Sequence, residues 1–254
     1  MSIFRRTRTL VATFLLAAGM AAAPAKADVI ELALLLDGSG SQGNTGWQLQ
    51  LSAYKNIFTN AFYSNAIVGG DTLVISAFKF YGGPGNVGVV EQKIGTTLIT
   101  DDASAATFGN QFTTAVFGTQ SGITPTNAAL NAAGSWLLSN GYDGDRLIID
   151  VSTDGDPNPE SDALSINTAG SLNSTYGIVT NAIGVGSGIS QSYLDALTGA
   201  GGGFKVVASN FGAFETALED KLFREVTSVP APGGLLILGF GLMLSGIRRR
   251  SIRS

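Results

Sequence analysis

The sequence has 254 residues, of which 44% are hydrophobic and 13% charged, which supports one large domain with a buried core and excludes a disordered chain. It contains no cysteine and no histidine, so thiol nucleophiles, disulfides, serine–histidine–aspartate triads and the usual zinc sites are excluded. Any bound metal must therefore be a hard cation held by oxygen atoms.

The first 27 residues have the pattern of a secretory signal peptide. A basic start with Arg5, Arg6 and Arg8 precedes a short apolar run that ends near Ala23. Ala25-Lys26-Ala27 then fits the small-x-small rule of signal peptidase sites. We expect residues 1–27 to be removed before Asp28.

Between Asp28 and Thr227, strand and helix signals alternate along the chain. Buried apolar or β-branched runs predict strands at 29–36, 72–80, 87–94, 146–152, 178–183 and 204–208. Apolar residues at helical spacing predict helices at 47–62, 102–117, 126–138, 161–174, 190–197 and 211–226. Repeated β-α alternation predicts an α/β domain over residues 28–227, with a mainly parallel central sheet, strand 87–94 at its edge, and helices on both faces.

The segment 228–254 resembles the PEP-CTERM type of sorting tail. A short proline motif, Val229-Pro230-Ala231-Pro232, precedes an apolar run over 233–247 and then Arg248-Arg249-Arg250, with Ala231 at the place of the usual glutamate. The resemblance implies recognition and removal of the tail by an exosortase-like membrane protease. It also implies delivery to the surface or extracellular matrix of a Gram-negative bacterium after transient inner-membrane anchoring. The alternative is a plain C-terminal transmembrane helix.

The charge of the predicted domain excludes a nucleic-acid partner. The two ends hold eight of the 15 basic residues and none of the 19 acidic ones, which leaves seven basic against 19 acidic residues and a net charge near −12. Such a domain has no basic surface for DNA or RNA.

Three polar segments carry the candidate chemistry. Asp37-Gly38-Ser39-Gly40-Ser41 follows the first strand, Thr124-Pro125-Thr126-Asn127 precedes a predicted helix, and Asp154-Gly155-Asp156 follows strand 146–152. Loops after the carboxyl ends of parallel strands gather along one edge of a sheet, so these segments are expected to converge. Carboxylates and neutral hydroxyls are oxygen ligands that suit Mg²⁺, with Mn²⁺ or Ca²⁺ as alternatives.

These segments resemble the metal-ion-dependent adhesion site (MIDAS) of the von Willebrand factor A (vWA) family. That site has the pattern Asp-x-Ser-x-Ser, a distant Thr, and an Asp after the fourth strand. The matching residues are Asp37, Ser39, Ser41, Thr124 and Asp154. Thr126 competes with Thr124, and the family's Thr-x-Thr register favours Thr124. The stretches 140–143 and 146–152 further resemble a bacterial subgroup of unknown function.

The resemblance implies a three-layer, Rossmann-like vWA fold and an exported adhesion or binding module. Its cation would bind an acidic group on a protein or polysaccharide partner. One alternative is a metal-dependent hydrolase, which needs a general base; without histidine, only Asp156 or Asp150 with a raised pKa could serve. The other alternative is a passive structural component of the extracellular matrix.

Overall fold

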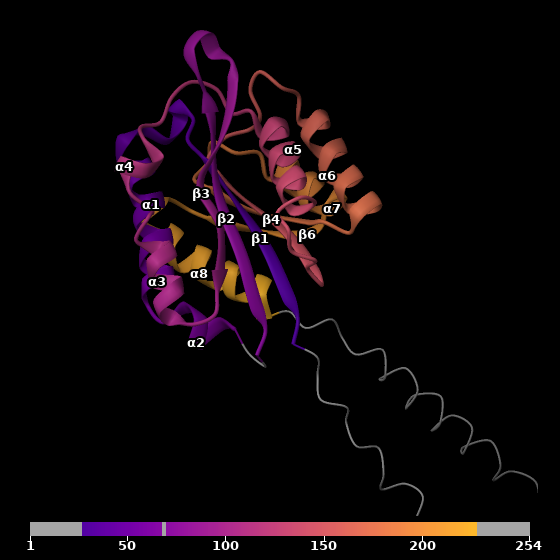
Figure 1. Ribbon diagram of the computed structural model, residues 1–254. Helices are drawn as coiled ribbons and strands as arrows, with labels where there is room; N and C mark the ends of the chain where they lie inside the picture. The colour runs from indigo at the N-terminus through magenta and orange to yellow at the C-terminus, as the bar shows by residue number, and fades with distance from the viewer. Residues whose placement is uncertain (1–26, 68–69, 228–254) are drawn as a thin grey trace, which may run out of the picture.

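A six-stranded sheet forms the centre of the molecule (Figure 1), and the computed structural model describes residues 27–67 and 70–227. The strand order is β3-β2-β1-β4-β5-β6, and all neighbours pair parallel except β2 and β3. The strands are β1 (Val29–Asp37), β2 (Thr72–Gly82), β3 (Gly88–Ile99), β4 (Arg146–Thr153), β5 (Val179–Val185) and β6 (Gly202–Ala208). The predicted α/β class, the mainly parallel sheet and the edge position of the third strand are confirmed.

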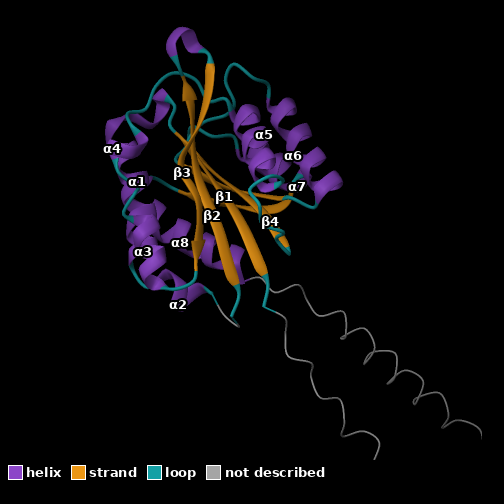
Figure 2. Ribbon diagram, in the orientation of Figure 1, coloured by secondary structure: helices purple, strands orange, loops and turns teal. Residues whose placement is uncertain are grey.

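Helices cover both faces of the sheet (Figure 2) because the strands bury apolar side chains on both sides. Within β1, Leu32, Leu34 and Leu36 face one layer, whereas Ala33 and Leu35 face the other. The first layer holds α1 (Gly43–Thr59), α2 (Phe62–Ala66), α3 (Asp102–Gly109), α4 (Thr114–Phe117) and α8 (Phe211–Thr227). The second holds α5 (Thr126–Leu137), α6 (Asp162–Tyr176) and α7 (Gln191–Ala200). Two short 3₁₀ turns, η1 (Gly40–Gln42) and η2 (Pro84–Asn86), lie in loops.

The single helix expected over 102–117 is wrong, because the chain forms α3 and α4 instead. Asp101 and Ser104 form a reciprocal capping box at the start of α3, and the Thr113 hydroxyl accepts the Val116 N–H to begin α4. Phe112 lies between the two helices and stacks on Phe117 with 5.2 Å between ring centroids. The aromatic residues thus stay buried although the helix is interrupted.

The apolar stripe expected on a single helix over 47–62 is also divided between two helices. Helix α1 ends at Thr59, and Ala61 adopts a left-handed conformation with φ of 56° before α2 begins at Phe62. Phe62 is nevertheless fully buried and packs on Phe58 with 4.6 Å between ring centroids. The apolar positions were therefore predicted correctly, but the continuity of the helix was not.

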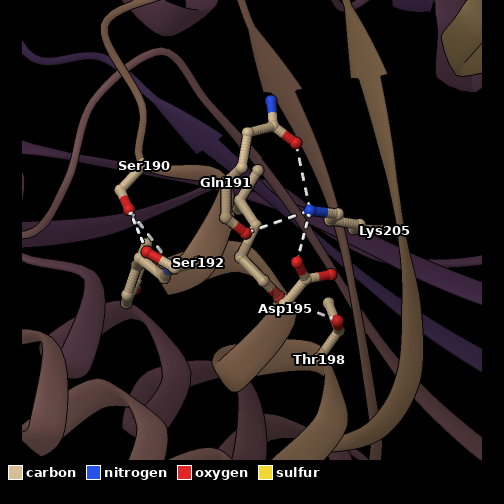
Figure 3. Close-up of polar contacts among 8 residues, drawn as sticks. Ser190, Gln191, Ser192, Asp195, Thr198 and Lys205 are labelled. Carbon is tan, nitrogen blue, oxygen red and sulfur yellow. Dashed lines mark hydrogen bonds and ion pairs between the residues drawn. The ribbon is translucent and has the colours of Figure 1, made fainter.

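Side chains of helix α7 attach it to the edge strand β6 (Figure 3). The Lys205 ammonium on β6 donates to the carbonyl and side-chain oxygens of Gln191, both at 3.0 Å, and pairs with Asp195 at 2.8 Å. The Ser190 hydroxyl accepts the Tyr193 N–H at 3.2 Å, as expected for the residue that caps this helix.

A buried ion cluster attaches α8 to the sheet. Lys221 pairs with Asp150 of β4 and, at 2.6 Å, with Glu225 one turn further along the same helix. All three side chains lie fully inside the protein. At the end of α8, the Arg146 guanidinium donates to the carbonyl oxygens of Glu225 and Val226.

Both ends of the described domain lie at the same end of the sheet, where β1 and β4 begin. Arg146 begins β4 and holds the last turn of α8, while Val29 begins the parallel neighbour β1. Asp37 ends β1 at the opposite edge, next to the protruding β2–β3 hairpin (Figure 1). The predicted signal peptide, apart from Ala27, and the predicted sorting tail lie outside the described residues. Within 27–67 and 70–227, no helix has the length and apolar content to cross a membrane.

Candidate metal site

The candidate site lies between β1 and β4, the two neighbouring strands from which later strands are added toward opposite sides of the sheet. From β1 the chain adds β2 and β3 on one side, and from β4 it adds β5 and β6 on the other. The carboxyl ends of β1 and β4 therefore flank the crevice where ligands bind in open α/β sheets. Asp37 ends β1, and Asp154 follows the last residue of β4.

Four of the five predicted ligands meet in one hydrogen-bonded group. The Ser39 and Ser41 hydroxyl oxygens are 2.8 Å apart; Ser41 lies in the 3₁₀ turn η1, so the loop is not extended as the sequence predicted. The Ser41 hydroxyl donates to the Asp154 carboxylate at 2.7 Å. The backbone N–H of Ser39 donates to the Asp37 carboxylate at 2.8 Å. Asp37 and Ser39 are buried and Ser41 is exposed, so the group opens to solvent on one side.

The two carboxyl groups lie in surroundings that resist their ionisation. Burial raises the pKa of Asp37 to about 7, against hydrogen bonds from Thr153 and Ser39 that lower it and repulsion from Asp154 that raises it. Burial also raises the pKa of Asp154, while the hydrogen bond from the Ser41 hydroxyl lowers it. A cation between the two groups would offset this cost by neutralising them.

Thr124 lies on the neighbouring loop, and its backbone pairs with the loop that begins at Asp154. Its N–H donates to the Asn158 carbonyl at 3.0 Å, and its carbonyl accepts the Asn158 N–H at 3.1 Å. Asn158 belongs to the loop that begins at Asp154. Among the described residues, no hydrogen bond links the Thr124 hydroxyl to the other four side chains. Its role as a ligand stays a prediction.

The competing Thr126 is directed elsewhere. It is buried, and it lies near the Tyr193 phenol together with Ser165. Burial raises the pKa of that phenol, while the nearby Ser165 and Thr126 hydroxyls lower it. Thr126 therefore lies in the polar packing between α5, α6 and α7.

Two features of the site were missed from the sequence. The Thr153 hydroxyl donates to the second oxygen of Asp37 at 2.6 Å, so this residue orients the buried carboxylate. Lys79 of β2 holds the loop before Thr124: its ammonium donates to the Thr119 carbonyl and lies 4.0 Å from the Tyr81 ring centroid. A threonine directly before the matched aspartate was the available signal for Thr153. A lysine inside a buried strand run was the signal for Lys79.

Backbone contacts fix the loops against one another. The Gly40 N–H donates to the Gly122 carbonyl at 2.9 Å, and the Ser121 N–H donates to the Gly38 carbonyl at 2.8 Å. Gly122 has a φ of 65°, and a Cβ atom there would lie 2.7 Å from the Cα atom of Gly82. Only glycine fits this approach of three loops.

The donor set fits a hard divalent cation. Asp37 and Asp154 supply two negative charges, and the serines supply neutral oxygens, which are ligand types used for Mg²⁺, Mn²⁺ and Ca²⁺. Within the described ranges there is no group of three or more acidic side chains that could hold a metal. A site here would therefore depend on the hydroxyl groups as well as on the carboxylates.

The strand order and the two helical layers give this domain the fold of solved vWA domains. The chain belongs to the family described as "Protein of unknown function (DUF1194)", whose model matches residues 27–230. No curated protein matches the sequence.

Solved structures of vWA domains share the fold. Proximal thread matrix protein 1 (PTMP1) from the mussel byssus is 19% identical, with a TM-score of 0.57 over 79% of this chain and 46% of that chain. A von Willebrand factor type A protein from Catenulispora acidiphila is 14% identical, with a TM-score of 0.58 over 78% of this chain and 43% of that chain. The chain thus spans less than half the length of both proteins.

Metal is recorded in two of the related structures. The manganese-loaded TRAP protein of Plasmodium vivax is 21% identical, with a TM-score of 0.53 over 77% of this chain and 73% of that chain. PTMP1 has also been solved with a zinc-occupied MIDAS motif, at 20% identity and a TM-score of 0.57 over 78% of this chain and 46% of that chain. At these identities the likeness shows the fold.

Proposed function

We propose that this domain is a metal-dependent binding module. Asp37, Ser39, Ser41 and Asp154, together with Thr124, would hold one divalent cation. An acidic group on a protein or matrix partner would complete its coordination. The observation that carries the proposal is the hydrogen-bonded chain from Ser39 through Ser41 to Asp154, beside the buried carboxylate of Asp37.

Asp37 and the two serines would contribute differently to cation binding. Asp37 is fully buried and held by Thr153 and Ser39, so it would act as a fixed anionic ligand. Ser39 and Ser41 contribute oxygen without charge, which leaves the cation incompletely neutralised. When bound, the cation supplies a positive centre at which a carboxylate of a partner can bind. Mg²⁺ is the proposed ion, with Mn²⁺ or Ca²⁺ as alternatives.

Binding without turnover accounts for the surroundings of the site better than hydrolysis does. Asp150, one of the two acids considered as a general base, is buried in the core and paired with Lys221. The other, Asp156, accepts the Ser190 N–H at 2.7 Å and so helps to hold the loop after β5. The hydrolase alternative therefore receives no support from Asp150.

Export to the cell surface is part of the proposal. It is supported by the sequence patterns of residues 1–27 and 228–254, which predict a signal peptide and a tail processed by an exosortase-like protease. Related folds occur in proteins named for matrix and adhesion roles, including a pilus adhesin, SpaC, of Lactobacillus rhamnosus GG, at 13% identity and a TM-score of 0.59 over 79% of this chain and 31% of that chain.

Calorimetric titration with Mg²⁺, Mn²⁺ and Ca²⁺ tests the metal site. The wild-type protein should bind one divalent ion, and Asp37→Ala should abolish binding because it removes a charge that neutralises the cation. Asp143→Asn, which changes an exposed acid of another loop, should bind as the wild type does. Thermal melting in chelator should show Asp37→Ala still folded. Equal metal binding by Asp37→Ala and wild type would refute the site, and its absence from both would favour a passive structural role.

A further inference from the structure

The loops around the candidate metal site carry acidic residues but no basic ones. At this edge of the sheet the connecting segments are 38–42, 83–87, 118–125, 154–161, 186–190 and 209–210, and none contains lysine or arginine. Asp154, Asp156 and Glu160 lie in the fourth of these segments, and Asp37 lies at the end of β1. Lys79, which ends near the third segment, is only 2% exposed. Around the cation, a partner would therefore meet uncharged loops and the acids of segment 154–161, and no basic side chain.

This distribution selects against partners with many closely spaced carboxylates. Like charges repel over several ångströms at the protein surface, and a bound divalent cation offsets only the charge at its own position. A partner with one carboxylate between uncharged groups gains the contact with the cation. A polyanion gains the same contact but places its remaining charges against Asp156 and Glu160.

Beside the site, the β2–β3 hairpin presents an uncharged apolar surface. Its turn, residues 83–88, protrudes beyond the edge of the sheet (Figure 1). No residue from Tyr81 to Val90 carries a charge. Val87 is 64% exposed, the largest exposure of any large apolar side chain in the described part of the molecule. Pro84 beside it is also exposed.

The base of the hairpin is fixed directly to the loops of the metal site. The Gly82 N–H donates to the Ser121 carbonyl at 2.9 Å, and the Ser121 N–H donates to the Gly38 carbonyl. A Cβ atom on Gly88 would lie 2.8 Å from the Pro125 side chain. The turn is thus held beside the loops that carry Ser39 and Thr124.

We propose that the metal site and the hairpin turn 83–88 together bind a protein partner through one isolated carboxylate with apolar residues beside it. This inference rests on the proposed function and specifies its partner. The cation takes the carboxylate, Val87 and Pro84 contact the apolar neighbours, and the surrounding acids exclude acidic polysaccharides.

A random peptide library tests this partner class with the purified full chain. Selection in Mn²⁺, with elution by chelator, should enrich peptides that carry a single aspartate or glutamate beside apolar residues. Val87→Ser should weaken the enriched peptides about tenfold, the loss expected for one buried valine, and should leave calorimetric Mn²⁺ affinity unchanged. Leu138→Ser is the matched control, because Leu138 is 48% exposed at the end of α5 away from the site.

The outcomes separate this inference from the proposed function. Four results would each overturn the partner class. The first two are enrichment of polyacidic peptides and unchanged peptide affinity in Val87→Ser. The others are no enrichment despite bound Mn²⁺, and metal-dependent binding of polygalacturonate as tight as that of the peptides. Failure of the wild-type chain to bind Mn²⁺ at all would overturn the proposed function itself.

Discussion

Replacing Lys221 by methionine should destabilise the domain strongly, and increasingly so as the pH rises. Lys221 is the one cation in a fully buried cluster with two acids, Asp150 and Glu225. Removing one partner of a buried ion pair costs about 3–5 kcal/mol, because the remaining charge stays unpaired. A domain stability of roughly 5–15 kcal/mol would lose a large share.

The pKa shifts set the sign of the pH dependence. Burial and the repulsion of Asp150 raise the pKa of Glu225 to about 8, although Lys221 and Asn181 lower it. The folded wild type therefore keeps a proton that the unfolded chain releases, so its stability falls as the pH rises from about 4.5 to 8. Burial also raises the pKa of Asp150, and Lys221 lowers it, so removing the ammonium should make the deficit relative to wild type grow as the pH rises.

Urea unfolding at pH 5.5, 7 and 8.5, followed by circular dichroism, measures both effects. Glu225→Gln is the matched control, because it removes the surplus acid and keeps an oxygen for Lys221. This variant should show a flatter pH dependence, so its stability relative to wild type should rise from pH 5.5 to pH 8.5. The reasoning fails if Lys221→Met unfolds at the same urea concentration as wild type, or if Glu225→Gln costs as much as Lys221→Met.

Three further predictions concern the site and the chain ends. Ser41→Ala removes the hydroxyl that contacts Asp154 and should weaken Mn²⁺ binding about tenfold in calorimetry; unchanged affinity would contradict its place in the site. Gly122→Ala should lower the melting temperature more than Gly141→Ala, since both have positive φ but only Gly122 approaches another backbone closely; equal shifts would contradict the packing argument. Intact-mass spectrometry of native material should find a chain that begins at Asp28 and lacks the tail from residue 233 onward; retained arginines near 250 would favour the plain anchor.

Buried strands and the loops after them could be predicted because their signals are local. The apolar run over 29–36 ends at Asp37, so both the strand and the position of its carboxylate follow from the sequence. Asp154 follows strand 146–152 in the same way. Their approach to one another also follows, because parallel neighbours present their carboxyl ends at one edge.

Other features depend on tertiary contacts that periodicity does not record. The stripe expected along 211–226 contains Phe214, Leu218 and Leu222, which are buried as predicted. Lys221 and Glu225 lie on the same face of α8, but a search for apolar spacing passes over charged residues. The surroundings of Thr126 likewise depend on Tyr193, which lies near it but is distant in sequence.

The placement of both domain ends opposite Asp37 has a mechanical consequence. If the predicted tail anchors the protein, a pull on a partner at the metal site acts along the length of the sheet. The load enters at the end of β1 and leaves through α8, which is joined to β4 by Lys221 and Asp150 and at its last turn by Arg146. Parallel strands pulled along their length must slide past one another and break many hydrogen bonds together. The force would therefore load the hydrogen bonds between strands in shear.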